Sequence, residues 1–77
     1  MQVEIKLFAT LRPYLKKVPD DGFLTVSKDT SIDQVITMLE LPEDEIKLVF
    51  VNGRHAPRDH ILKNGDRLGL FPPVGGG

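Results

Sequence analysis

Residues 28–41 read KDTSIDQVITMLEL, and this stretch decides which fold the rest of the chain can form. Its apolar residues recur three and four positions apart, which places Ile32, Val35, Ile36 and Leu39 on one stripe of a helix. Thr30 or Ser31 can cap the start, and Asp33 in the first turn suits the positive end of the helix dipole. We expect the helix to end at Pro42, which cannot donate the next backbone hydrogen bond, after about three turns.

Two strands are predicted before this helix. QVEIKLF at 2–8 alternates apolar and polar residues, so Val3, Ile5 and Leu7 lie on one face of a strand. The segment 9–22 contains two prolines and a glycine and is expected to connect this strand to the next. FLTVS at 23–27 is rich in β-branched and aromatic residues, which favours a second strand. The two strands should form a hairpin.

Two further strands are predicted after the helix. KLVFVNGR at 47–54 is an apolar run closed by Asn-Gly, the dipeptide that best tolerates the positive φ angles of a tight turn. Residues 55–65 look irregular and end in a second Asn-Gly turn. DRLGLF at 66–71 is the last strand, with Leu68 and Leu70 on one face.

The order strand, strand, helix, strand, strand predicts an α+β domain in which one main helix crosses one face of a mixed sheet. This arrangement is the ubiquitin-like β-grasp. Its first and last strands run parallel in the middle of the sheet, so the chain leaves from the centre of the fold. We assign residues 1–71 to the β-grasp domain and 72–77 to an extended, flexible C-terminal tail.

Composition excludes several classes of function. A chain of 77 residues has room for one domain, and without cysteine it cannot form disulfides, thiolate zinc sites, iron–sulfur clusters or a cysteine nucleophile. A formal net charge of −1 gives no reason to expect nucleic acid or a membrane as a partner. His55 and His60 have only Asp59 nearby, so no metal site is predicted. We expect a cytoplasmic protein.

The tail FPPVGGG at 71–77 combines a stiff part with a thin one. It consists, after Phe71, of Pro72, Pro73, Val74, Gly75, Gly76 and Gly77. Prolines favour an extended polyproline conformation, and glycines remove every side chain from the last stretch. Such a rod can enter a narrow tunnel and carry the carboxylate of Gly77 to a partner's active site. A carboxylate is a poor electrophile and needs activation, commonly as an acyl-adenylate. The alternative is a frayed terminus.

The whole chain resembles the MoaD/ThiS family of sulfur-carrier proteins. The resemblance rests on LFATLR at 7–12, VNGR at 51–54, NGDRL at 64–68 and FPPVGGG at 71–77. The last motif is most similar to that of the small subunit of molybdopterin synthase. Two features depart from the family: Pro13 follows Arg12 where an acidic residue is common, and three glycines stand where many relatives have alanine or serine before the final pair.

The resemblance implies a carrier that is no enzyme by itself and binds no cofactor. A ubiquitin-activating-type enzyme would use MgATP to adenylate Gly77, and a persulfide sulfur would displace AMP to leave a thiocarboxylate. The large subunit of molybdopterin synthase, or another sulfur acceptor, would receive the tail. Three alternatives remain open: sulfur transfer for thiamin or the tungsten cofactor, a ubiquitin-like modifier conjugated to lysines, and an interaction module without covalent chemistry.

A partner-binding patch is predicted on the helix-free face. Strand alternation places Phe8, Phe50 and Phe71 opposite the residues that face the helix. They form either a docking surface for the activating enzyme and the acceptor, or the end of the core. Arg12, Arg54 and Arg67 either steer an acidic partner or are simply exposed. Arg12 is included in the predicted patch.

Overall fold

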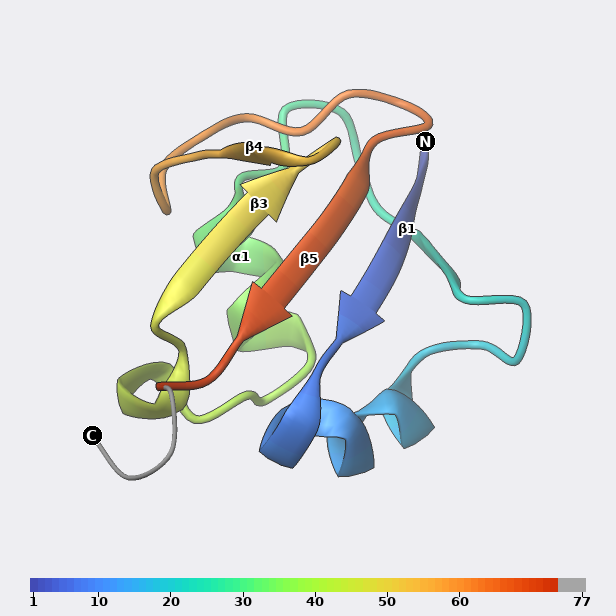
Figure 1. Ribbon diagram of the computed structural model, residues 1–77. Helices are drawn as coiled ribbons and strands as arrows, with labels where there is room; N and C mark the ends of the chain where they lie inside the picture. Colours follow the sequence, from blue (N-terminus) through green and yellow to red (C-terminus); the bar gives the residue numbers. More distant parts are fainter. Residues whose placement is uncertain (74–77) are drawn as a thin grey trace.

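The structure, a computed structural model, describes residues 1–73 and contains one five-stranded sheet. Its elements in chain order are β1 (Gln2–Leu7), η1 (Ala9–Lys17), β2 (Phe23–Thr25), α1 (Ile32–Met38), η2 (Glu43–Glu45), β3 (Leu48–Val51), β4 (Arg54–His55) and β5 (Arg67–Phe71). The strands lie in the order β2-β1-β5-β3-β4 (Figure 1). The element order and this mixed sheet confirm the predicted ubiquitin-like β-grasp.

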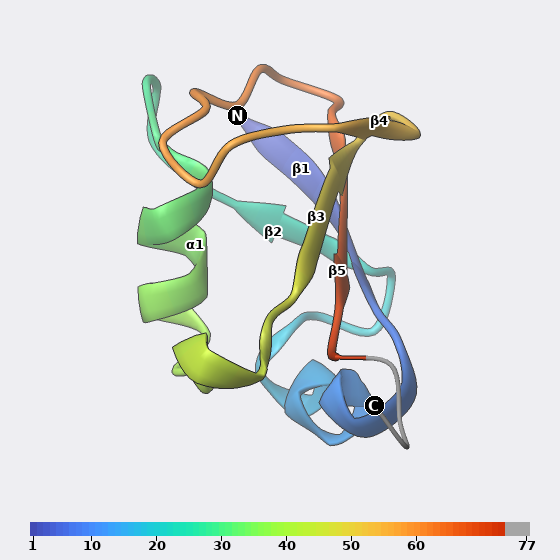
Figure 2. The same cartoon turned by 60° about the vertical axis from the view of Figure 1, so that its left-hand side comes forward.

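The two ends of the described chain meet at the centre of the sheet. β1 pairs with β5 in parallel, with Ile5 opposite Leu68 and Leu7 opposite Leu70. β2 pairs with β1 antiparallel, which confirms the predicted hairpin, and β3 pairs with β5 antiparallel. Because β1 and β5 point the same way, both end beside η1 and η2 (Figures 1 and 2).

The core lies between the sheet and α1, which covers one face only (Figure 2). The predicted helix stripe is buried, as are the alternating apolar residues of β1 and β5. These side chains are Val3, Ile5, Leu7, Ile32, Val35, Ile36, Leu39, Leu68 and Leu70. Burial of apolar area on this scale is the main source of stability for a domain without disulfides.

The helix α1 is shorter than predicted. Ser31 begins it with a capping box, in which its hydroxyl accepts from the Gln34 amide and the Gln34 side chain accepts from the Ser31 amide. The helix ends at Met38, two turns later, so the expectation of three turns ending at Pro42 was wrong. Glu40 stops it with a positive φ of 55°, and the amide of Leu41 donates to the Ile36 carbonyl.

The segment predicted only as a connection contains a 3₁₀ helix, η1, of nine residues. It is entered through Ala9, whose φ is +52°, and is anchored by the fully buried Leu11. Pro13 lies inside it, because the fixed φ of proline falls within the 3₁₀ range. Lys17 at its end donates a hydrogen bond to Glu40, and this bond and charge lower the pKa of the Glu40 carboxyl.

The Asn-Gly turn after β3 is confirmed, but it leads into a strand that was not predicted. Asn52 and Gly53 have φ angles of +54° and +83°, as a type I′ turn requires. β4 then pairs with the end of β3, where residues 55–65 had been expected to be irregular from their start. Two residues are too few to show an alternating pattern. Within residues 1–73, no helix combines the length and the apolar character needed to cross a membrane.

Candidate functional site

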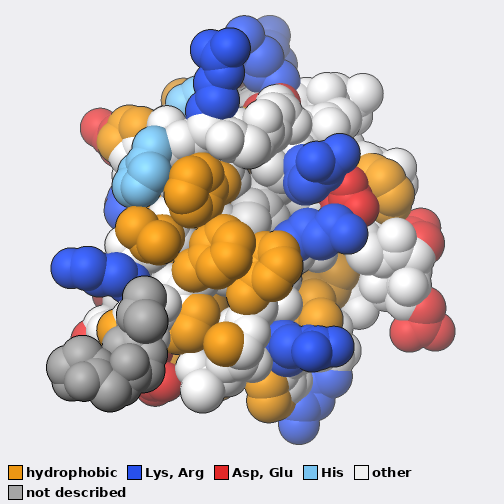
Figure 3. All heavy atoms as spheres, in the orientation of Figure 1, with side chains coloured by type: hydrophobic (Ala, Val, Ile, Leu, Met, Phe, Trp, Pro, Cys, Tyr) orange, Lys and Arg blue, Asp and Glu red, His pale blue; other side chains and the backbone are white. Residues whose placement is uncertain are grey.

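Three phenylalanines gather on the face of the sheet that α1 leaves bare. Phe8 follows β1, Phe50 lies in β3 and Phe71 ends β5, and apolar side chains collect at the centre of this face (Figure 3). The Phe8 and Phe71 rings are stacked, with centroids 4.2 Å apart and planes 2° from parallel, and Phe50 meets Phe71 edge-on at 5.5 Å. We call these three side chains the aromatic cluster. None belongs to the buried core, and Phe8 is 38% exposed.

The aromatic cluster covers a glycine. Gly69 lies opposite Lys6 on β1 and Phe50 on β3, and its backbone is buried. A Cβ atom at this position would lie 3.6 Å from Cε2 of Phe8 and 3.8 Å from Cε1 of Phe71, which is ordinary van der Waals contact. A methyl group at position 69 would therefore fit against the two rings, and the space beyond it is occupied by them.

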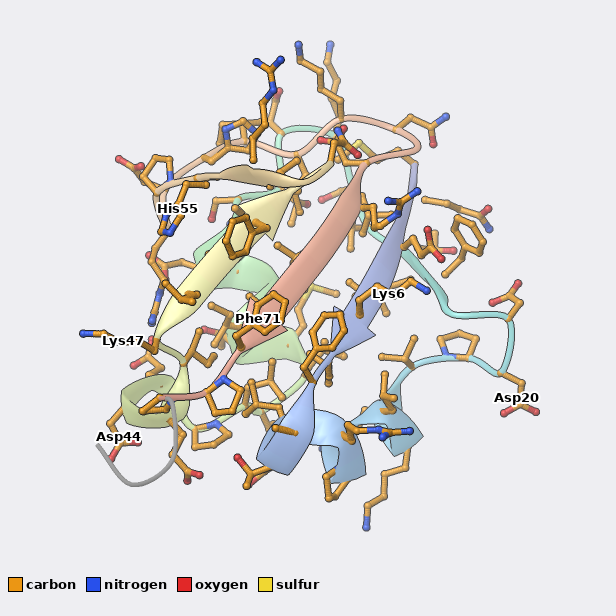
Figure 4. All side chains as sticks on the ribbon, in the orientation of Figure 1. Lys6, Asp20, Asp44, Lys47, His55 and Phe71 are labelled. Atoms are coloured by element: carbon orange, nitrogen blue, oxygen red, sulfur yellow. The ribbon has the colours of Figure 1, made fainter. Side chains whose placement is uncertain are left out.

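A charged border runs along one side of the aromatic cluster. Glu4, Lys6 and Arg67 project from the central strand pair, and Lys6 and Phe71 both lie on the viewer's side of the sheet (Figure 4). Arg67 Nε lies 3.3 Å from Glu4 Oε1, and Lys6 Nζ lies 3.6 Å from Glu4 Oε2. A shallow depression, also lined by Gly53 and Gly69, lies between this border and the aromatic cluster.

The predicted arginines separate in the structure. Arg12 is exposed on η1 and lines a second depression that shares Phe8 and Lys6 with the first. Arg54 is exposed on β4, away from the aromatic depression, whereas Arg67 lines it. His55, which was considered only as a metal ligand, packs edge-on against Phe50 with centroids 4.8 Å apart. Residues 1–73 hold no group of three or more His, Cys, Asp or Glu side chains placed to bind a metal.

The root of the tail is held beside the aromatic cluster. The carbonyl of Phe71 accepts a hydrogen bond from the Lys47 amide at 2.8 Å, and Pro72 is half-buried while Pro73 is exposed. β5 ends near η2, at the end of the sheet where β1 also ends (Figure 1). The other tail residues predicted to act, Val74, Gly75, Gly76 and Gly77, lie outside the described residues.

Sequence reasoning missed Glu4, Lys6 and Gly69 as parts of this face. A signal for them was present, because the alternation that places Val3, Ile5 and Leu7 in the core places the residues between them on the opposite side. Gly69 lies between the buried Leu68 and Leu70, so the same alternation places position 69 on the helix-free face. What the alternation cannot give is which strands are neighbours, and only that brings Glu4 to Arg67.

Comparison with known proteins decides the family. Residues 5–77 match the sequence profile of the ThiS family, which is nearly the whole chain. The chain belongs to the ThiS family. Members of the ThiS family are small sulfur-carrier and ubiquitin-like proteins. No curated protein matches the chain in sequence.

Solved structures similar to this ThiS-family chain come from archaea and bacteria. SAMP1 from Haloferax volcanii is 27% identical over the full length of both chains, with a TM-score of 0.69. A putative molybdopterin converting factor subunit 1 from Pyrococcus furiosus is 26% identical over 96% of this chain and 99% of its own, with a TM-score of 0.74. A complex of molybdopterin-converting factor subunits 1 and 2 from Helicobacter pylori, at 20% identity over both full chains and a TM-score of 0.60, shares the fold alone.

Proposed function

We propose that this protein is a sulfur carrier that delivers sulfur as a C-terminal thiocarboxylate, with molybdopterin synthesis as its pathway. The observation that carries the proposal is the ThiS-family match, which runs through the glycines at 75–77. The relative from Pyrococcus furiosus, named as a molybdopterin converting factor subunit, favours that pathway over the thiamin and tungsten-cofactor routes. The proposal requires the mature protein to end in the carboxylate of Gly77.

In the proposed reaction the main chain is the reacting group. A Gly77 carboxylate oxygen attacks the α-phosphorus of ATP, and pyrophosphate leaves as the acyl-adenylate forms. The terminal sulfur of a persulfide then attacks the carbonyl carbon, and the bond to AMP breaks. A further thiol cleaves the sulfur–sulfur bond, which leaves a thiocarboxylate on Gly77 and a disulfide on the donor side. The MgATP is bound by the adenylating partner.

The folded domain then serves to dock and to aim the tail. Partner proteins commonly bind through a few central aromatic side chains. The aromatic cluster supplies such a centre, and Phe71 adjoins Pro72 at the root of the tail. We assign Phe8, Phe50 and Phe71, with Arg12 at the neighbouring depression, to the docking surface. The Pyrococcus furiosus relative is called subunit 1, and by analogy a large subunit would accept the tail here.

A second candidate is a ubiquitin-like modifier. Two of the similar Haloferax volcanii structures are of SAMP1, a small archaeal modifier protein. Conjugation begins with the same adenylation, but a lysine amine of a target then attacks the acyl carbon in place of sulfur. Both candidates therefore need the same docking surface and the same Gly77 carboxylate, and they differ in the product.

The intact mass of the protein isolated from its own cells tests the proposal. We expect part of the population to show the mass of the 77-residue chain with one oxygen replaced by sulfur, and alkylation should map the change to Gly77. A ladder of heavier conjugates in place of this species would favour the modifier. Absence of both, even after incubation with an adenylating enzyme, ATP and a sulfur source, would contradict covalent use of the tail.

A further inference from the structure

We infer that the adenylating partner presents carboxylates to Lys6 and Arg67, and that Glu4 holds these two side chains in place while limiting their affinity for the partner. This inference rests on the proposed function, because it names the chemistry of the surface that covers the aromatic cluster. We call Lys6 and Arg67 the cationic pair.

The cationic pair lies along one side of the aromatic cluster, on the central strands. Glu4 and Arg67 are register partners on β1 and β5, and Lys6 and then Phe8 follow on the same face of β1. The side chains of Lys6 and Arg67 are 49% and 61% exposed, whereas that of Glu4 is 27% exposed. A partner that covers the depression lined by Phe8 and Phe71 must therefore also lie against the cationic pair, which lines the same depression.

The charges of this border do not balance. One carboxylate, Glu4, faces two cations, so the group carries one net positive charge beside the aromatic cluster. Arg67 reaches Glu4 through Nε, and within residues 1–73 neither of its Nη nitrogens has a hydrogen-bond partner. A guanidinium with both Nη groups free presents a fork of donors that suits a second carboxylate.

The partner's chemistry follows from the cost of covering these groups. Removing water from a cation costs much free energy unless an opposite charge replaces the water. A neutral apolar surface that covered the whole depression would therefore bind poorly. An acidic surface meets the apolar cluster and the cationic pair together. Such charge complementarity acts mainly on the association rate and weakens as salt is added. The charges along β1 and β5 would thus make docking selective for a partner with an acidic surface.

The test is ATP–pyrophosphate exchange by the adenylating enzyme purified from the same cells, measured against the concentration of this protein. We expect Arg67→Gln and Lys6→Gln each to raise KM about twofold to fivefold, the effect of losing one exposed charge contact. Glu4→Gln should lower KM by a similar factor, because it frees both cations. Lys28→Gln, on the loop before α1 and outside the depression, makes the same change in net charge as the Lys6 and Arg67 variants and should leave KM unchanged.

The predicted changes in KM have opposite signs for Glu4→Gln and Arg67→Gln, and this difference distinguishes an effect on docking from an effect on folding. If Glu4 and Arg67 served only as a structural pair, Glu4→Gln and Arg67→Gln would have the same effect. Both variants would then raise KM and lower the melting temperature. Lys6→Gln does not touch the Nε contact and provides a second reading if an Arg67 variant folds poorly. Exchange with unaltered KM in the three variants would overturn this inference alone. No exchange with the wild-type protein would overturn the proposed function, and the inference with it.

Discussion

Gly69 and Gly53 line the same depression, yet the backbone uses each glycine for a different reason. Gly53 completes a type I′ turn with a φ of +83°, a region in which other residues are strained. Gly69 lies in regular β5, where two phenylalanine rings occupy the space beside it. The backbone conformation of the turn therefore requires Gly53. The conformation at position 69 does not require glycine, which only leaves space beside the two rings.

We therefore predict opposite effects of alanine at the two positions. Gly69→Ala should raise the free energy of unfolding by about 0.5–1 kcal/mol, because the new methyl group fits and the entropy cost of a glycine in a strand is removed. Gly53→Ala should lower it by about 1–2 kcal/mol through the left-handed backbone alone, since its Cβ would meet no atom within 4 Å. Urea unfolding of both variants measures the difference, and equal signs would contradict this account.

Among the helices and strands, the sequence predicted those that follow a local period and missed those that depend on tertiary contacts. The strands and the stripe of α1 follow from repeats of two and of three to four residues. The 3₁₀ helix η1 was not predicted, because Pro13 is a residue that usually interrupts a helix. The buried Leu11 anchors the segment to the core, and this contact cannot be read from the local sequence. The candidate site was predicted in the same uneven way. Alternation placed the three phenylalanines on one face, and the predicted parallel pairing of the first and last strands is confirmed. The register of that pairing, which brings Phe8 onto Phe71, could not be predicted.

The end of α1 is an element-scale feature that composition does not signal. Glu40 adopts the left-handed conformation that glycine usually supplies after a helix. We predict that Glu40→Gly is more stable than Glu40→Gln by about 1 kcal/mol at neutral pH, because both variants lose the carboxylate and only glycine relieves the backbone. Thermal or urea unfolding compares the two, and a more stable Gln variant would contradict the strain.

The same carboxylate gives a pH dependence with a definite sign. The hydrogen bond and charge of Lys17 lower the pKa of Glu40 in the folded protein, so the contact stabilises the fold above the unfolded pKa. This contribution is lost as the pH falls through the lowered value. Wild type should therefore exceed Glu40→Gln in stability near neutral pH, and the gap should close in acid. Because Glu40 is fully exposed, the gap is small.

The proposed docking surface and the proposed reacting group lie in different parts of the chain. The described core is built from residues between Val3 and Leu70, and the proposed reacting group lies beyond it at Gly77. We predict that a chain lacking Gly76 and Gly77 keeps its melting temperature, supports no ATP–pyrophosphate exchange, and inhibits the full-length protein competitively. Adding Phe71→Ala to the shortened chain should abolish that inhibition without unfolding it. Inhibition that survives the Phe71 change would place docking elsewhere.

The parallel pairing of β1 with β5 has a consequence for how the protein is made. The centre of the sheet joins residues 4–7 to residues 67–70, so its two strands leave the ribosome nearly a whole chain apart. Contacts this distant in sequence slow folding, because a long loop must close before they form. During synthesis β1 can pair with β2, but its other edge stays open, and open strand edges invite aggregation. The domain can thus reach its native state only when translation of its sequence is almost complete.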